Sequence, residues 1–197
     1  MTEFRSTTPG GTRPAAESAS GPQAADLVST EAGTGVFEDL LEANRAFAAT
    51  FALGGFDGVA HAGVAILTCM DSRIDPLGML GLHPGDAKIV RNAGARLTEA
   101  AIEAMILGVH LLEVERILVI PHTRCAMASN TEEEIEARIR ASSGSHSTPY
   151  GFHVIKDQQS ALRTDVETIR RHPLVPGRVV VGGFMYDVDT GLLHHVV

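Results

Sequence analysis

The sequence predicts an α/β fold with a mainly parallel central sheet of about four strands, flanked by helices and followed by a short extra C-terminal strand. Short, continuous apolar runs suit strands that are buried on both faces, as in a parallel sheet. These runs alternate with longer segments of helical periodicity, which is the pattern of α/β proteins. The chain has 197 residues, of which 44% are apolar, so it is long enough for one domain with a substantial core.

The N-terminal part differs in composition from the rest. Residues 1–35 are mostly Gly, Pro, Ser, Thr and Ala without apolar periodicity, so we expect a disordered leader followed by a single domain over 36–197. The first expected element is a helix over 36–53, ended by Gly54-Gly55. Its apolar residues recur near helical spacing: Phe37, Leu40, Leu41, Phe47 and Phe51.

The expected strands follow from the apolar runs. They cover residues 63–68, 87–90, 116–120 and 178–186. Each run is short and lacks helical periodicity, which favours a buried strand over a helix. Asp189-Thr190-Gly191 then predicts a turn into the short last strand.

Capping residues mark the helices between these strands. The expected helices cover 98–112, 131–141 and 157–171, with a loop rich in Ser and Gly over 142–151. Thr98 followed by Glu99 is an N-cap with an acidic first turn. Thr131 with Glu134 three residues later forms a capping box, and Pro173 ends the last helix.

Both cysteines of the chain lie in motifs that follow expected strands. Cys69-Met70-Asp71-Ser72-Arg73 comes after the first strand, and His122-Thr123-Arg124-Cys125 comes after the third. Two thiolates and one imidazole form a three-ligand zinc set, and catalytic zinc sites keep the fourth position open for water. The ligands would meet at one crevice if the first and third strands are neighbours and the second lies on the other side. The pattern therefore predicts a zinc enzyme that activates water.

Asp71 and Arg73 are the candidates for assisting such a site. Two thiolates cancel the charge of zinc, so the site should acidify water less than a site with three histidines. Asp71 can accept a hydrogen bond from the activated water or compete for the open position, and Arg73 can hold Asp71 as a bidentate partner. The alternative is a structural ion pair at the end of a strand.

Charge and composition exclude several other classes. The net charge of −8 argues against a general binder of nucleic acid or anionic membranes. No apolar run approaches the roughly 20 residues that span a bilayer, and we see no secretory signal. We therefore expect reduced thiols in the cytoplasm rather than a disulfide between Cys69 and Cys125.

Three motifs together resemble the β-class carbonic anhydrases over about residues 61–195. They are Cys69-Met70-Asp71-Ser72-Arg73, Arg91-Asn92-Ala93-Gly94 and His122-Thr123-Arg124-Cys125-Ala126-Met127. The resemblance implies an α/β fold and Zn²⁺ bound by Cys69, His122 and Cys125, with Asp71 and Arg73 as the catalytic dyad. It implies reversible hydration of carbon dioxide to bicarbonate and a proton. It also implies a homodimer or higher homo-oligomer, in which an N-terminal helix commonly packs on the partner, a role that suits 36–53.

Two residues depart from the family pattern. Many relatives have an acidic or small residue in place of Arg124, and commonly Gly in place of Ala126. Arg124 could lower the pKa of bound water, hold bicarbonate or point to solvent.

Two other functions stay open: hydrolysis of carbonyl sulfide or a related heterocumulene on the same zinc site, and a non-catalytic, zinc-folded interaction or sensor module with a fourth protein ligand.

Some polar residues are expected to have no part in the chemistry. Arg91-Asn92-Ala93-Gly94 is expected to be a strand-to-helix turn, with a wall of the site as the alternative. Lys88 and Arg96 are expected to be solvated. His194-His195 is expected to be a solvated tail rather than a metal site.

Overall fold

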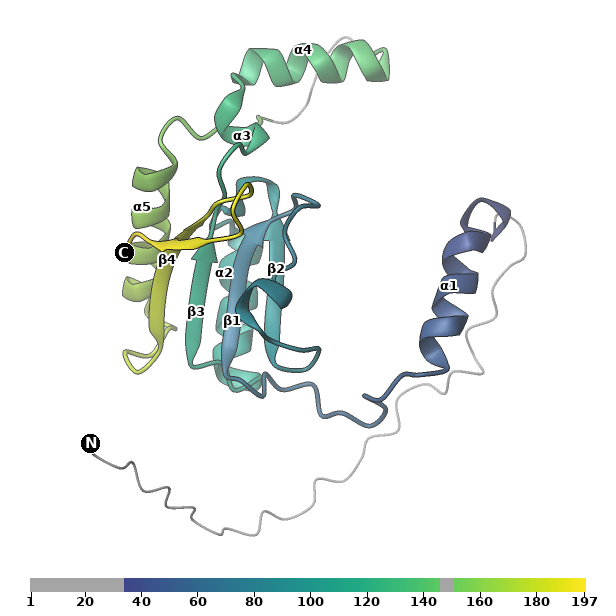
Figure 1. The fold of residues 1–197 in the computed structure, drawn as a ribbon. Helices are drawn as coiled ribbons and strands as arrows, with labels where there is room; N and C mark the ends of the chain where they lie inside the picture. Colours follow the sequence, from purple (N-terminus) through teal and green to yellow (C-terminus); the bar gives the residue numbers. More distant parts are fainter. Residues whose placement is uncertain (1–33, 146–150) are drawn as a thin grey trace. The chain divides into compact units, whose positions relative to one another are not determined.

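The structure is a computed structural model that describes residues 34–145 and 151–197 (Figure 1). The chain forms two compact units, one ending at Ala52 and the other spanning Leu53–Val197. The expected leader lies outside the described residues except for its last two positions, and so does half of the 142–151 loop, namely residues 146–150.

A five-stranded sheet in the order β2-β1-β3-β4-β5 forms the centre of the larger unit. Its strands are β1 (Val64–Cys69), β2 (Ala87–Asn92), β3 (Arg116–Ile120), β4 (Val180–Tyr186) and β5 (Leu193–His195). The first four strands are parallel, and β5 pairs antiparallel to β4. The predicted α/β class, the mainly parallel sheet and the short last strand are confirmed, and so is the expected position of β1 between β2 and β3.

The described part of the larger unit contains four α-helices, and the two whose capping residues the sequence showed begin at those caps. The four are α2 (Glu99–Leu111), α3 (Ala126–Ser129), α4 (Glu132–Ser143) and α5 (Gln158–Arg171), and the short 3-10 helices are η3 (Gly78–Leu80) and η4 (Ala93–Ala95). The Thr98 hydroxyl accepts a hydrogen bond from the Ala101 amide at 3.2 Å. Thr131 and Glu134 form the predicted capping box. These bonds satisfy amides that have no partner within the first helical turn.

The central strand β1 is buried on both faces, as its apolar run predicted, whereas β2 at the edge of the sheet is only half-buried. Every residue of β1 is buried, and alternate residues face opposite sides. Leu67 belongs to a core cluster with residues of α2 and α5, which cover one face (Figure 1). Ile66 belongs to a second cluster on the other face, with Ile74 and residues of η3. Both Cys69 and Cys125 are members of this second cluster.

The smaller unit contains a shorter helix than the sequence predicted. Thr34–Phe37 form the 3-10 helix η2, and α1 covers only Glu38–Ala48 rather than 36–53. The chain leaves the helix because Thr50 turns back on Phe47: its amide and its hydroxyl both donate to the Phe47 carbonyl, at 3.1 and 3.2 Å.

Two further expectations at the C-terminal end were wrong in detail. The fourth strand begins at Val180 because Val179 closes a turn by donating to the Pro176 carbonyl at 2.9 Å. His194 and His195 are exposed, as expected, but they lie in β5 rather than in a tail, and the His195 ring lies 5.2 Å from that of Phe184.

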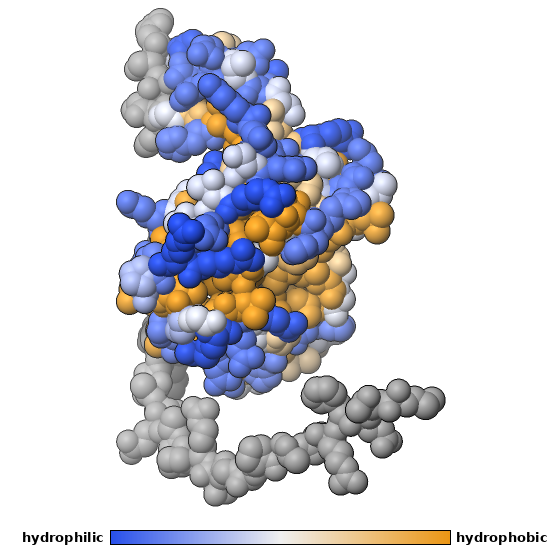
Figure 2. All heavy atoms as spheres, turned by 90° about the vertical axis from the view of Figure 1, so that its left-hand side faces the viewer, coloured by the Kyte–Doolittle hydropathy of each residue, from blue (hydrophilic) through white to orange (hydrophobic). Residues whose placement is uncertain are grey.

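The side of the molecule with α5 and β4 has a mixed surface, on which orange apolar patches lie between blue polar residues (Figure 2). In the described part of the chain, no helix is long and apolar enough to cross a membrane.

Candidate metal centre and active site

The candidate ligands lie at the point where the winding of the sheet reverses. From β1 the chain crosses to β2 on one side, whereas β3 pairs with β1 on the other side. Cys69 is the last residue of β1, and His122 and Cys125 lie in the loop between β3 and α3. Open α/β sheets bind ligands at such a switch point, so the topology brings together the two motifs that lie far apart in sequence.

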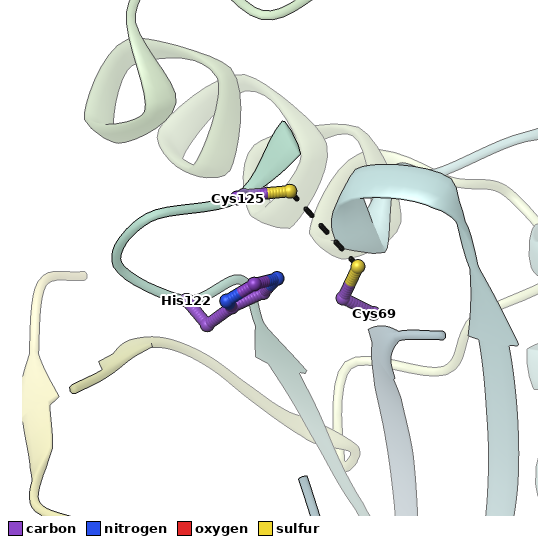
Figure 3. Close-up of side chains that lie close together, drawn as sticks. All are labelled: Cys69, His122 and Cys125. Carbon is purple, nitrogen blue, oxygen red and sulfur yellow. Dashed lines mark hydrogen bonds between the residues drawn. The ribbon is translucent and has the colours of Figure 1, made fainter. Parts of the chain in front are cut away.

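The three side chains point toward one another (Figure 3). Their ligand atoms all lie within 4.8 Å of one another, and all three residues are buried. The two Sγ atoms are 4.0 Å apart. Tetrahedral zinc with Zn–S bonds of about 2.3 Å would place two sulfurs about 3.8 Å apart, whereas a disulfide requires about 2.05 Å. The cluster therefore has the spacing of a metal site and not of a disulfide.

His122 is oriented as a metal ligand would be. Its Nδ1 lies 2.8 Å from the Thr123 carbonyl, so Nδ1 carries the proton and donates it there. Its Nε2 is buried and makes no hydrogen bond within the described part of the chain. A buried, unpaired nitrogen is costly unless something else uses its lone pair. A cation between Nε2 and the two sulfurs would do so, and the donor set of two sulfurs and one imidazole suits zinc.

The environment of Cys69 favours a thiolate. The hydrogen bond that joins the two thiols, with the Sγ atoms 4.0 Å apart, lowers the pKa of Cys69, although burial acts in the opposite direction. The Gly94 amide also donates to the Cys69 Sγ, at 3.4 Å. The same hydrogen bond, together with burial, raises the pKa of Cys125. Metal binding requires both thiols to release their protons.

Asp71 and Arg73 form a bidentate pair at the edge of the cluster. Arg73 donates from Nε to Oδ1 at 2.8 Å and from Nη2 to Oδ2 at 2.7 Å, and its amide donates to Oδ1 at 3.0 Å. These bonds hold the pKa of Asp71 well below its usual range, so the group is a carboxylate. Oδ2 also lies 3.7 Å from Nε2 of His122. Asp71 was expected either to be held by Arg73 or to compete for the open metal position, and the structure contains the first arrangement.

A pocket of about 460 Å³ opens onto these residues. Part of its wall is apolar and consists of Met70, Ala93, Ala126 and Met127. The polar lining consists of Cys69, Asp71, Ser72, Arg73, His122 and Cys125. An apolar wall beside a few convergent polar groups is typical of a site for a small molecule.

Arg124 belongs to an exposed ion pair rather than to this pocket. Its Nη2 donates to Asp189 Oδ1 at 2.5 Å, and both side chains are more than half exposed. The backbone of Arg124 adopts a φ of 55°, which turns the chain between His122 and Cys125. Of the three expected roles for Arg124, the structure shows a side chain that points to solvent.

The Arg91-Asn92-Ala93-Gly94 motif includes a turn, as expected, but its side chains also support the site. Asn92 closes the turn by accepting from the Arg96 amide at 2.8 Å and donating to the Arg96 carbonyl at 2.7 Å. Arg91 donates to the carbonyls of Cys69 and Asp71, at 2.9 and 2.6 Å. Sequence reasoning missed these bonds because carbonyl acceptors carry no residue-specific signal.

The expectation that Arg96 is solvated was wrong, whereas Lys88 is partly exposed, as expected, but also has a partner. Arg96 donates to both oxygens of the buried Asp165 on α5, at 2.7 and 3.0 Å. Lys88 donates to the Gly58 carbonyl. Asp165 lies 69 residues from Arg96 in the sequence, so no local pattern pairs the two.

Comparisons with known proteins agree with this geometry. The family model described as carbonic anhydrase matches residues 64–193. The β-carbonic anhydrase 1 of Mycobacterium tuberculosis is 32% identical over 133 residues, which are 68% of this chain and 81% of that protein. The carbon disulfide hydrolase of an Acidianus species is 32% identical over 149 residues, covering 64% of this chain and 72% of that protein.

Solved structures give the same result. The crystal structure of a carbonic anhydrase from Streptococcus mutans is 31% identical and superposes with a TM-score of 0.73, covering 82% of this chain and 97% of that one. The fold, the converging motifs and these matches lead to one conclusion: the chain belongs to the β-class carbonic anhydrase family of enzymes.

Proposed function

We propose that this protein catalyses the zinc-dependent, reversible hydration of carbon dioxide to bicarbonate and a proton. The observation that carries the proposal is the buried Cys69, His122 and Cys125 cluster, with its unpaired Nε2, next to an Asp71 carboxylate held by Arg73. The three ligands leave one position of a tetrahedral ion open.

Each residue has a role that follows from its position. Cys69, His122 and Cys125 would hold Zn²⁺, which supplies the Lewis acidity that makes water a nucleophile near neutral pH. Asp71, ionised and close to Nε2 of His122, can accept a hydrogen bond from that water and so orient it. Arg73 keeps the carboxylate in this position. The apolar wall that includes Met70 and Met127 suits a small, linear, apolar substrate.

Stopped-flow measurement of carbon dioxide hydration by the zinc-loaded protein tests the proposal. Because Arg73 holds Asp71, we expect turnover both near pH 7 and near pH 8.5. Turnover that starts only at the higher pH would support carbonic anhydrase activity but show that Asp71 closes the site at neutrality. A zinc-loaded protein without turnover at either pH would overturn the proposal.

A second candidate is hydrolysis of carbonyl sulfide or a related heterocumulene on the same site. The apolar wall favours it, and relatives named carbon disulfide hydrolase match this chain over 64% of its length. Comparing kcat/KM for carbon dioxide, carbonyl sulfide and carbon disulfide on one preparation would separate the two.

A non-catalytic, zinc-folded module is less well supported, since the ligand cluster within the described residues has three members rather than four.

We further propose a cytoplasmic homodimer or higher homo-oligomer. Reducing conditions keep the two thiols available to zinc. The smaller unit exposes large apolar residues that cluster on one face of α1, and exposed apolar faces of this kind mark interaction sites. They are Phe37, Leu40, Leu41 and Phe47, which are 41–62% exposed. A second copy of the chain is the partner that we propose for this face.

A further inference from the structure

Arg91 holds the loop that connects the first candidate ligand to the dyad. It lies in β2, and its side chain is not part of the pocket lining. Its Nε donates to the Cys69 carbonyl at 2.9 Å, and its Nη2 donates to the Asp71 carbonyl at 2.6 Å. Because these carbonyls lie on either side of Met70, one guanidinium fixes the backbone between Cys69 and Asp71.

Farther along this loop, Ile74 is buried in the second core cluster and Arg73 Nη2 donates to the Arg124 carbonyl at 3.4 Å. Between Cys69 and Asp71, however, the backbone has few anchors besides Arg91. The pairing of β1 with β2 reaches Cys69 and Asn92, and the Met70 amide donates to the Asn92 carbonyl at 3.1 Å. Beyond that bond the loop leaves the sheet. Met70 is 68% exposed, so burial of its side chain does little to hold the loop in place. The Asp71 carbonyl also accepts from the Ile74 amide, at 3.1 Å, which closes a turn within the loop but does not tie it to the sheet.

We propose that Arg91 is a positioning residue that directs the Asp71 carboxylate toward Arg73 and away from the metal position. The inference rests on the proposed function, because it concerns the dyad of that site. A planar guanidinium with two donors fixes two acceptors at once, whereas a lysine ammonium on a flexible stem cannot reproduce both bonds in the same geometry. Without Arg91, the loop could rotate and Asp71 could leave Arg73.

Arg116 provides a matched control. It is also an exposed arginine on a strand of the same sheet, and its Nη2 donates to the Ala62 carbonyl at 2.6 Å. Ala62 precedes β1, whereas Asp71 follows it, so this bond lies at the opposite end of the strand from the site. A purely structural role for Arg91 predicts equal effects of the two substitutions.

The experiment compares Arg91→Ala, Arg91→Lys and Arg116→Ala with the unaltered protein. It measures kcat/KM for carbon dioxide hydration with zinc, the visible absorption bands of the cobalt-substituted protein, and thermal unfolding. We expect Arg91→Ala to lower kcat/KM by about 10–100-fold and to alter the cobalt bands, with Arg91→Lys in between. Arg116→Ala should leave kcat/KM within about twofold and the cobalt bands unchanged, because its bond is remote from the ligands.

Three outcomes would overturn the inference. One is an Arg91→Ala protein with unchanged kcat/KM and cobalt bands; another is an equal loss in Arg116→Ala. If Arg91→Ala does not fold, Arg91→Lys decides: unchanged kcat/KM and cobalt bands in that variant count against positioning. If the unaltered protein does not hydrate carbon dioxide, the proposed function fails, while the cobalt bands still report whether Arg91 controls the surroundings of the metal.

Discussion

The orientation of His122 illustrates how single atoms define the site. Nδ1 donates to a backbone carbonyl, and this bond leaves the Nε2 lone pair directed at the two sulfurs. The residue types and their spacing sufficed to predict the cluster, because few roles other than metal binding combine two thiols and an imidazole after two strands of one sheet. Arg91 and Arg96 could not be predicted in the same way, since their acceptors are backbone carbonyls and a carboxylate 69 residues away.

Replacing Cys125 tests the ligand assignment. Cys125→Ser should lose zinc and the stability that zinc contributes, which is about 4 kcal/mol when free zinc exceeds its Kd by about 1,000-fold. For a chain of this size, that corresponds to a fall of about 8–16 °C in the midpoint of thermal unfolding. Metal analysis and a thermal melt at a fixed zinc concentration measure both effects.

Ser129→Ala is the control, because it removes only a hydroxyl that donates to the Cys125 carbonyl at 2.9 Å. It should retain zinc. A Cys125→Ser protein with full zinc content and an unchanged melting point would exclude Cys125 as a ligand.

Replacing Asp71 tests the dyad. Asp71→Asn should keep zinc but lower kcat/KM at least about 100-fold, because the neutral amide accepts a hydrogen bond from the water less strongly and binds Arg73 less well. The pKa of Asp71 is depressed, so its carboxylate form persists above that low pKa and the native rate should not reflect its titration near neutral pH. Stopped-flow assays across neutral pH check this.

Asp75→Asn in the same loop is the control for charge, since Asp75 caps the Leu77 and Gly78 amides outside the pocket. Equal rates for the Asp71→Asn and native proteins would remove Asp71 from the mechanism.

Among the elements, helix starts were easier to predict than the ends of elements. Thr98 and Thr131 cap their helices through a local side-chain bond, so a few neighbouring residues contain the whole signal. The end of α1 depends instead on the Thr50 bonds to Phe47, and the start of β4 depends on the turn that begins at Pro176. Such turns have nearly the same free energy as a continued helix or strand, so periodicity alone does not locate them.

The η4 turn offers a prediction at this scale. Gly94 has a φ of 80°, and a Cβ there would meet Ile155 Cδ1 at 2.6 Å. Gly94→Ala should therefore cost about 1–3 kcal/mol and displace the amide that donates to Cys69. Thermal unfolding and zinc affinity by chelator competition measure the two effects.

Gly177→Ala is the control, since a Cβ at Gly177 meets nothing within 4 Å. If Gly94→Ala were as stable as Gly177→Ala and bound zinc equally well, the close packing around η4 would have no role in the site.

At the scale of the whole molecule, the sequence predicted the architecture of the larger unit because the apolar runs, caps and motifs all agree. The sequence could not predict that α1 belongs to a different compact unit from the sheet, because its periodicity is that of any helix with one buried face. The proposed leader and the single domain over 36–197 stay predictions.

The association of chains can be tested through the apolar face of α1. Leu40→Asp should shift the protein toward monomers, because it places a charge within that face. Ala46→Asp adds the same charge on the opposite side of the helix, so it should leave the association state unchanged. Sedimentation velocity at several concentrations compares both variants with the native protein, and an unchanged oligomer in Leu40→Asp would argue against this interface.

The division of the core has a consequence for how the protein acquires its metal. The cluster beneath α2 and α5 contains none of the three candidate ligands, so its strands and helices can assemble without an ion. Cys69 and His122 meet only once β1 and β3 are paired. The strands should therefore pair first, and the metal ion should bind second. Refolding in the presence of a chelator would then yield a folded, metal-free protein, to which a chosen metal could be added afterwards.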